Sequence, residues 1–136
     1  MGRHVPVILV LALVAISTAG CSWRPIPARG LTGIDSTADV LALDPDAYDT
    51  VALRAKQVTR TEDGRLRIEL DIANIDPSWR TVTVQVQTRF LDPAGVYSGD
   101  ETPMEMVVIS PDSTVHYECV SLTPAASYVV HIKTPY

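Results

Sequence analysis

The stretch RLRIELDIA, residues 65–73, decides the fold. Its apolar residues (Leu66, Ile68, Leu70 and Ile72) alternate with charged ones. Successive side chains of a β-strand point to opposite faces, so this segment has one apolar face and one charged face. A helix would scatter the same apolar residues around its axis, and the period of two therefore predicts a strand.

The same alternation continues on both sides of this stretch. Residues 81–90 repeat it, and Asp63-Gly64 predicts a hairpin between strands at 51–60 and 65–73. The turn Asp92-Pro93-Ala94-Gly95 separates residues 81–90 from the chain that follows. Further strands are predicted at 96–98, 104–109, 114–121 and 127–133.

Seven short strands between regular turns predict an all-β fold, an antiparallel β-sandwich of immunoglobulin-like type. The Cys…Trp…Cys signature of antibody domains is absent from the sequence, so this likeness concerns architecture. Residues 38–43 fit either one helical turn or a strand at the edge of the sandwich.

The amino-terminal segment predicts export. Arg3 and His4 precede twelve apolar residues at 5–16, then small residues and Cys21. Twelve helical residues extend about 18 Å, too short for the ~30 Å hydrocarbon core of a membrane, and this length is typical of a signal peptide. One alternative is ordinary signal-peptide cleavage, which would release the protein without any lipid on Cys21.

The stretch 18–21, Thr-Ala-Gly-Cys, resembles the lipobox of bacterial lipoproteins. The resemblance implies acyl chains on Cys21 and a membrane-anchored mature protein. We therefore expect a signal peptide at 1–20, a lipidated Cys and flexible linker at 21–37, and the sandwich domain at 38–136. Ser22 stands where Asp would favour inner-membrane retention, so in a Gram-negative cell we expect the periplasmic face of the outer membrane.

Charge and cysteine content narrow the function. The chain has 11 Lys and Arg residues against 16 Asp and Glu residues, a net charge of −5. An acidic surface repels nucleic acid, which is therefore not an expected partner. If Cys21 carries lipid, Cys119 has no intramolecular partner, and we expect it to be a buried apolar residue.

Three stretches resemble the YcfL family of bacterial envelope lipoproteins, whose domain has no assigned biochemical function. They are residues 70–74 (LDIAN), 88–95 (TRFLDPAG) and 122–126 (LTPAA). The resemblance covers about residues 50–133. It implies an immunoglobulin-like sandwich in the cell envelope and brings no catalytic residue.

The two histidines of the mature chain suggest one metal hypothesis. A hairpin between residues 114–121 and 127–133 would make His116 and His131 cross-strand neighbours, with Cβ atoms ~5 Å apart. With Glu118 as a third ligand, such a pair suits Zn²⁺ or Cu²⁺. We prefer the alternative of two solvated strand residues, so no metal or cofactor is assigned.

No other pattern predicts catalysis. The acidic stretch 44–49 lacks the glycine and the final glutamate of a calcium-binding EF-hand, and it is interpreted as a solvated turn. Cys119 and His116 are three residues apart and fall on opposite faces of a strand, so they cannot act as nucleophile and base. We expect a protein that is not an enzyme.

The aromatic residues in turns are the remaining candidates. Trp79 beside Arg80 has the composition of an interface hot spot, and Tyr97 lies next to another turn. The alternative, which we prefer, is that Trp79 covers the open end of the sandwich. The predicted function is an interaction module that docks another envelope protein through loops or through an edge strand at 96–98. Binding of a metal or small ligand at His116 and His131 is the second hypothesis.

Overall fold

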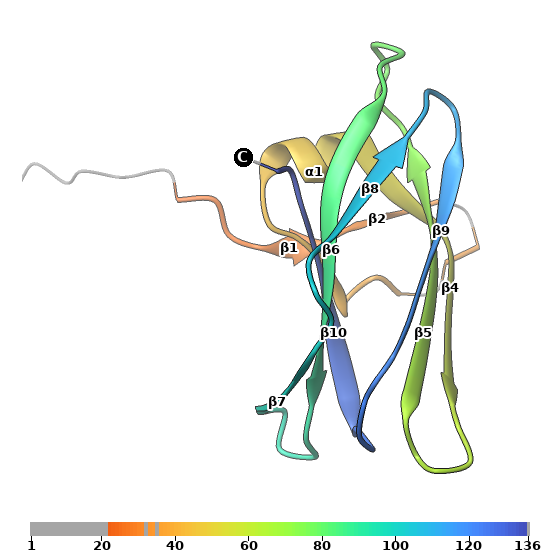
Figure 1. The fold of residues 1–136 in the computed structure, drawn as a ribbon. Helices are drawn as coiled ribbons and strands as arrows, with labels where there is room; N and C mark the ends of the chain where they lie inside the picture. The colour runs from red at the N-terminus through yellow and green to blue at the C-terminus, as the bar shows by residue number, and fades with distance from the viewer. Residues whose placement is uncertain (1–21, 32, 35, 136) are drawn as a thin grey trace, which may run out of the picture.

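The computed structural model describes residues 22–31, 33–34 and 36–135, so Cys21 and the predicted signal peptide lie outside the described residues. All seven predicted strands are present, as β4 to β10, and three short strands and a helix precede or adjoin them (Figure 1). The elements are β1 (Ile26–Pro27), β2 (Arg29–Gly30), β3 (Val40–Ala42), α1 (Pro45–Thr50), β4 (Val51–Arg60), β5 (Leu66–Asn74), β6 (Val82–Leu91), β7 (Tyr97–Glu101), β8 (Glu105–Ile109), β9 (Thr114–Val120) and β10 (Ser127–Lys133).

Two sheets face each other, which confirms the predicted all-β sandwich (Figure 1). The first sheet has the order β1-β3-β10-β6, and β7 and β8 pair one after the other along the far edge of β6. The second sheet has the order β2-β4-β5-β9. The β3–β10 and β2–β4 pairs are parallel, so both sheets are mixed rather than purely antiparallel as predicted.

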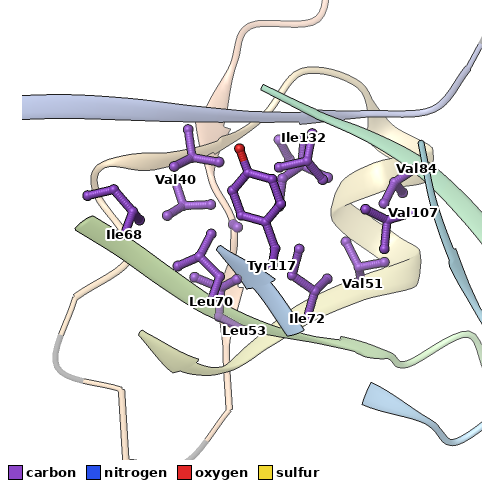
Figure 2. Packing of buried hydrophobic residues seen from close by; sticks show 14 of the residues in the cluster. Val40, Val51, Leu53, Ile68, Leu70, Ile72, Val84, Val107, Tyr117 and Ile132 are labelled. Atoms are coloured by element: carbon purple, nitrogen blue, oxygen red, sulfur yellow. The ribbon is translucent and has the colours of Figure 1, made fainter. Parts of the chain in front are cut away.

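A single layer of apolar side chains fills the space between the sheets (Figure 2). Every second residue of β6 from Val82 to Phe90 is buried, as the period of two predicts. One polar pair lies within the layer, where the Tyr117 hydroxyl is 2.9 Å from the Thr88 hydroxyl. Burial raises the pKa of Tyr117 to about 12, so this hydroxyl stays protonated and available as a donor.

The predicted hairpin between residues 114–121 and 127–133 is wrong. β9 pairs with β5, whereas β10 pairs with β6 and β3 in the other sheet. The connecting segment passes from one sheet to the other: the Ser121 N–H donates to Leu66 in β5, and the Ala126 N–H donates to Leu91 in β6. Alternation assigns each strand an inner face, and both arrangements satisfy it equally well.

The predicted linker at 21–37 needs correction at residues 26–30. β1 pairs with β3 of the first sheet and β2 pairs with β4 of the second, so the chain bridges both sheets within five residues. Ala28, between the two strands, is buried and donates its N–H to Val40. The folded domain therefore begins no later than Ile26, not at residue 38.

The acidic stretch 44–49 is a helix start rather than a solvated turn. Asp44 caps α1 by accepting the Ala47 N–H at 2.8 Å, and Pro45 occupies the first turn, where its missing N–H costs nothing. The second carboxylate oxygen of Asp44 accepts the Thr134 N–H at 2.8 Å. Both oxygens are thus used within the fold. The ambiguous residues 38–43 contain the strand β3.

Phe90 has the largest fully buried side chain, and its truncation tests the core. We expect Phe90→Ala to lower the free energy of unfolding by about 3–5 kcal/mol, because a cavity replaces the ring. Leu122→Ala is the control: Leu122 is 78% exposed, so its removal should change stability by less than about 0.5 kcal/mol. Urea unfolding measures both, and equal losses would contradict this description of the core.

Candidate functional site

Trp79 lies in the loop between β5 and β6 with 69% of its surface exposed. The prediction that it covers the open end of the sandwich is therefore wrong. The loop stands at the end of the sandwich where α1 and the β8–β9 turn also lie (Figure 1). We call residues 74–80 the Trp79 loop.

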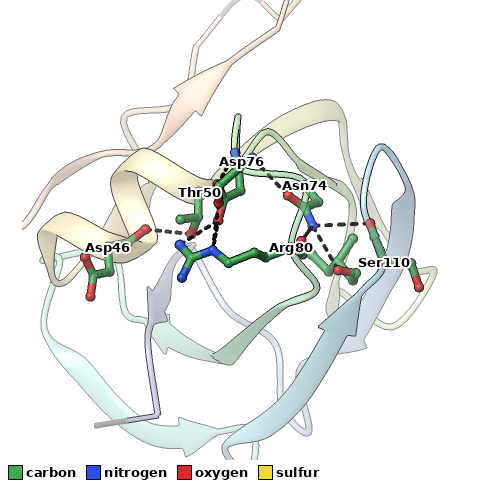
Figure 3. A network of polar contacts seen from close by, with 8 residues as sticks. Asp46, Thr50, Asn74, Asp76, Arg80 and Ser110 are labelled. Carbon is green, nitrogen blue, oxygen red and sulfur yellow. Dashed lines mark hydrogen bonds and ion pairs between the residues drawn. The ribbon is translucent and has the colours of Figure 1, made fainter.

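Asn74 ties the base of the Trp79 loop to the rest of the domain (Figure 3). Its buried side-chain amide donates to the carbonyls of Arg80 at 2.7 Å, Ile109 at 3.0 Å and Ser110 at 3.2 Å. Its side-chain oxygen accepts the Asp76 N–H at 2.9 Å. One side chain thus joins both ends of the loop to the end of β8, and a satisfied hydrogen-bond network of this kind makes a loop more rigid.

Asp76 organises the tip of the loop. One carboxylate oxygen accepts the Ser78 N–H at 2.8 Å, and the other receives Arg80 Nε at 3.1 Å and Nη2 at 2.8 Å. The hydrogen bonds from Ser78 are the main cause of a lowered pKa of Asp76, and Arg80 adds to it. The carboxylate is therefore ionised at neutral pH and holds Arg80 across the loop (Figure 3).

This framework holds Trp79 in a costly conformation. Its φ is +58°, in the left-handed region that glycine tolerates and bulky residues avoid. Such a residue costs about 1–2 kcal/mol. The exposed indole of Trp79 therefore stands at a backbone position that glycine would occupy at a lower cost in folding free energy.

The surface beside the Trp79 loop is apolar in part. An open depression runs from Arg80 across Thr81 and Thr83 to Met106. Met106 and Val108 lie on the outward side of β8, and more than half of each is exposed. Val108 is paired with Thr83 and Met106 with Gln85, so these groups share the outer face of the first sheet.

Tyr97 is not part of this surface. It pairs with Leu91 at the carboxyl end of β6, whereas Trp79 lies three residues before the other end of that strand. The predicted docking strand at 96–98 is found as β7, at residues 97–101, and it pairs with β6 irregularly. Arg89 lies over the Tyr97 ring, 5.4 Å from its centroid, so this aromatic already has a partner within the chain.

A second group of side chains lies on the outer face of the other sheet. Glu69, Asp71, His116 and Glu118 form it, and we call it the carboxylate–histidine cluster. His116 is paired with Asp71 and Glu118 with Glu69 across β5 and β9. His116 Nδ1 is 2.7 Å from Asp71, while Nε2 is 3.7 Å from Glu69 and 3.8 Å from Glu118.

His131 does not belong to the cluster. It lies between Gln87 and Leu41 in the first sheet, so the predicted pairing of His116 with His131 is wrong. Of the predicted ligands, the structure brings together His116 and Glu118 only. Glu69 and Asp71 were not among the predicted ligands, although both lie on the outward face of residues 65–73. Finding them required knowing that β5, rather than β10, is the neighbour of β9.

The cluster has the donor arrangement of a metal site. The ligand atoms of Glu69, His116 and Glu118 lie within 4.8 Å of one another. Tetrahedral zinc with bonds of ~2.0–2.1 Å needs ligand atoms roughly 3.4 Å apart, close to the two distances from Nε2. Asp71 on Nδ1 would fix the ring and leave Nε2 as the ligand. Arg67, 2.9 Å from Glu118 and 3.7 Å from Glu69, is the competing cation.

Cys119 lies on the inner face of β9 but is only partly buried, less than the predicted buried residue. It packs against the core, and its thiol is 3.3 Å from the Thr88 hydroxyl. Burial raises the pKa of the Cys119 thiol, which disfavours the reactive thiolate.

Two solved bacterial structures share this fold. A Campylobacter jejuni protein, cj0090, matches with a TM-score of 0.55 and 17% identity over 71% of this chain and 97% of its own. A DUF1425 family member from Shewanella sp. pv-4 matches with a TM-score of 0.52 and 14% identity over 68% of this chain and 85% of its own. The fold is thus one found in small bacterial domains of unassigned function.

Comparison by sequence adds no family. No protein-family model matches the chain, and no curated protein does. Within the described residues, no helix has the length and apolar character needed to cross a membrane.

The pKa values of the two histidines should be shifted in opposite directions. The hydrogen bond with Asp71, helped by the charges of Asp71, Glu69 and Glu118, raises the pKa of His116 above its ordinary 6.5, whereas burial lowers the pKa of His131. The stabilising contribution of His116 is thus complete below pH 6.5 and is lost as pH rises through its raised pKa. In an NMR titration, Asp71→Asn should lower the pKa of His116 and leave that of His131 unchanged. An unchanged pKa of His116 in this variant would contradict the contact between His116 and Asp71.

Proposed function

We propose that this protein is a lipid-anchored envelope protein whose β-sandwich is a non-catalytic docking module. Its docking surface is the Trp79 loop together with the adjoining outer side of β8. The observation that carries the proposal is an exposed indole held in a left-handed backbone conformation by a hydrogen-bonded framework.

The framework gives the physical argument. An exposed Trp gains nothing from burial in the isolated chain, and its backbone conformation costs stability. A rigid aromatic side chain suits binding, because few rotamers are lost when it enters a partner's pocket. Met106 and Val108 add apolar area on the same side of the molecule. The partner is therefore expected to be a protein with an apolar pocket for the indole.

The envelope location rests on the sequence. The lipobox-like stretch ending at Cys21 supports acylation there and, with Ser22 following, the periplasmic face of the outer membrane in a Gram-negative cell. The three turn-containing stretches support membership of the YcfL family, for which the resemblance implies a β-sandwich in the cell envelope. The Cys119 thiol is partly buried and its pKa is raised, which disfavours the reactive thiolate and supports a role other than catalysis.

Trp79→Gly separates docking from stability. Glycine accepts the left-handed conformation, so the melting temperature should stay the same or rise. Crosslinking in intact cells, read by mass spectrometry, should lose the partner that the wild-type chain captures. Val96→Ala removes an exposed apolar residue from the turn at the opposite end of the sandwich and should leave capture unchanged. Full capture by Trp79→Gly would overturn the proposal.

Metal binding at the carboxylate–histidine cluster is a second candidate function. The specific observation is Asp71 on His116 Nδ1 with Nε2 directed at two carboxylates. This arrangement suits Zn²⁺ or another divalent ion that accepts nitrogen and oxygen ligands. Its ligands differ from the original hypothesis, because Glu69 takes the place of His131.

Isothermal titration with Zn²⁺ tests this second function. We expect one ion per chain, with at least a tenfold loss of affinity in His116→Ala because the nitrogen ligand is removed. His131→Ala is the matched control and should bind as the wild-type chain does, since His131 lies in the other sheet. Equal affinity in the two variants, or no binding by the wild-type chain, would exclude the site.

A further inference from the structure

We propose that Trp23 lies in the headgroup layer of the membrane and holds the sandwich directly on the bilayer surface. This inference rests on the proposed acylation of Cys21. It adds to the acyl anchor a second contact with the lipid, made by a side chain of the folded domain at a defined position.

The chain between the acylated residue and the folded domain is short. Trp23 is already associated with the domain, with its ring 6.4 Å from that of Tyr48 in α1. Only Ser22 separates Trp23 from Cys21. Two residue steps extend at most about 7 Å. A lipid attached at Cys21 therefore holds this corner of the domain within about 7 Å of the acylated residue, and no long tether intervenes.

Trp23 is near side chains that are themselves fixed to the folded domain. The Tyr48 ring is near both Trp23 and Arg29, and the Arg29 guanidinium is 4.4 Å from its centroid. Arg29 also donates to Asp49 at 3.0 Å, and its neighbours Ile26–Gly30 are paired with both sheets. Trp23 thus rests on a cluster that belongs to the folded domain.

The exposed groups around Trp23 suit contact with a lipid surface. Trp23 is 39% exposed, and its neighbours Ser22 and Arg24 are exposed as well. An indole has an apolar body and a polar N–H, and such side chains favour the boundary between headgroups and acyl chains. Arg24 adds a cation where lipid phosphates lie. Because the acyl chains enter the bilayer two residues away, the lipid surface is the partner that this corner meets first.

The chain has two tryptophans, which permits a direct measurement. The lipidated mature protein is reconstituted in vesicles of phosphatidylethanolamine and phosphatidylglycerol that contain lipids brominated at shallow or deep acyl positions. Trp79→Gly leaves Trp23 as the sole emitter, and Trp23→Phe leaves Trp79. We expect shallow bromines to reduce Trp23 emission about twofold and deep bromines to reduce it less, as for an interfacial indole. Trp79 emission should stay within about a tenth of its value in unbrominated vesicles, as for an indole outside the bilayer.

The outcomes separate this inference from the proposed function. Mass measurement of the amino-terminal peptide reports acylation of Cys21 independently. Acylated protein with unquenched Trp23 would overturn the membrane contact and leave the anchor standing. An unmodified Cys21 would overturn both. Quenching of Trp79 as well as Trp23 would support the membrane contact but contradict the Trp79 loop as a surface free to dock a protein.

Discussion

The two sheets share one layer of buried side chains, and the rest of the structure follows from that constraint. Each of the strands β5, β6 and β10 places alternate residues in this layer, so their other residues must face outward. The outer faces are therefore free to carry chemistry without disturbing the core. Inside the layer, the Thr88 and Tyr117 hydroxyls satisfy each other. The charged residues of the quoted stretch lie outside because Leu66, Ile68, Leu70 and Ile72 occupy the inside.

This constraint also explains what the sequence could predict. A period of two identifies a strand and its inner face, so residues 65–73 and 81–90 were assigned correctly. It does not identify the neighbouring strand, because a strand satisfies the same pattern in either sheet. His116 and His131 were placed outward correctly but paired wrongly for this reason. Adjacent strands joined by Asp63-Gly64 were paired correctly, since a tight turn leaves no other partner within reach.

Short elements held by tertiary contacts escaped prediction. β1 and β2 have two residues each, too few to show any period, and they form because the edges of both sheets offer unpaired backbone groups. α1 depends on Asp44, whose second oxygen is held by Thr134 ninety residues later. The exposure of Trp79 depends on Asn74, which reaches carbonyls in β8 and in the turn that follows it. None of these partners is near in sequence.

The bridging of both sheets by β1 and β2 has a mechanical consequence. A pull at the amino-terminal end loads these two short strands before any long strand of the sandwich. They can peel away with the loss of few hydrogen bonds, and among the core side chains of the described residues only Ala28 leaves its place. Peeling as far as β3 frees residues 26–39, a length of about 45–50 Å when extended. Release of these strands would let the amino-terminal chain reach further from the domain, while the pairs among β4, β5 and β9 and among β6, β8 and β10 would keep their partners.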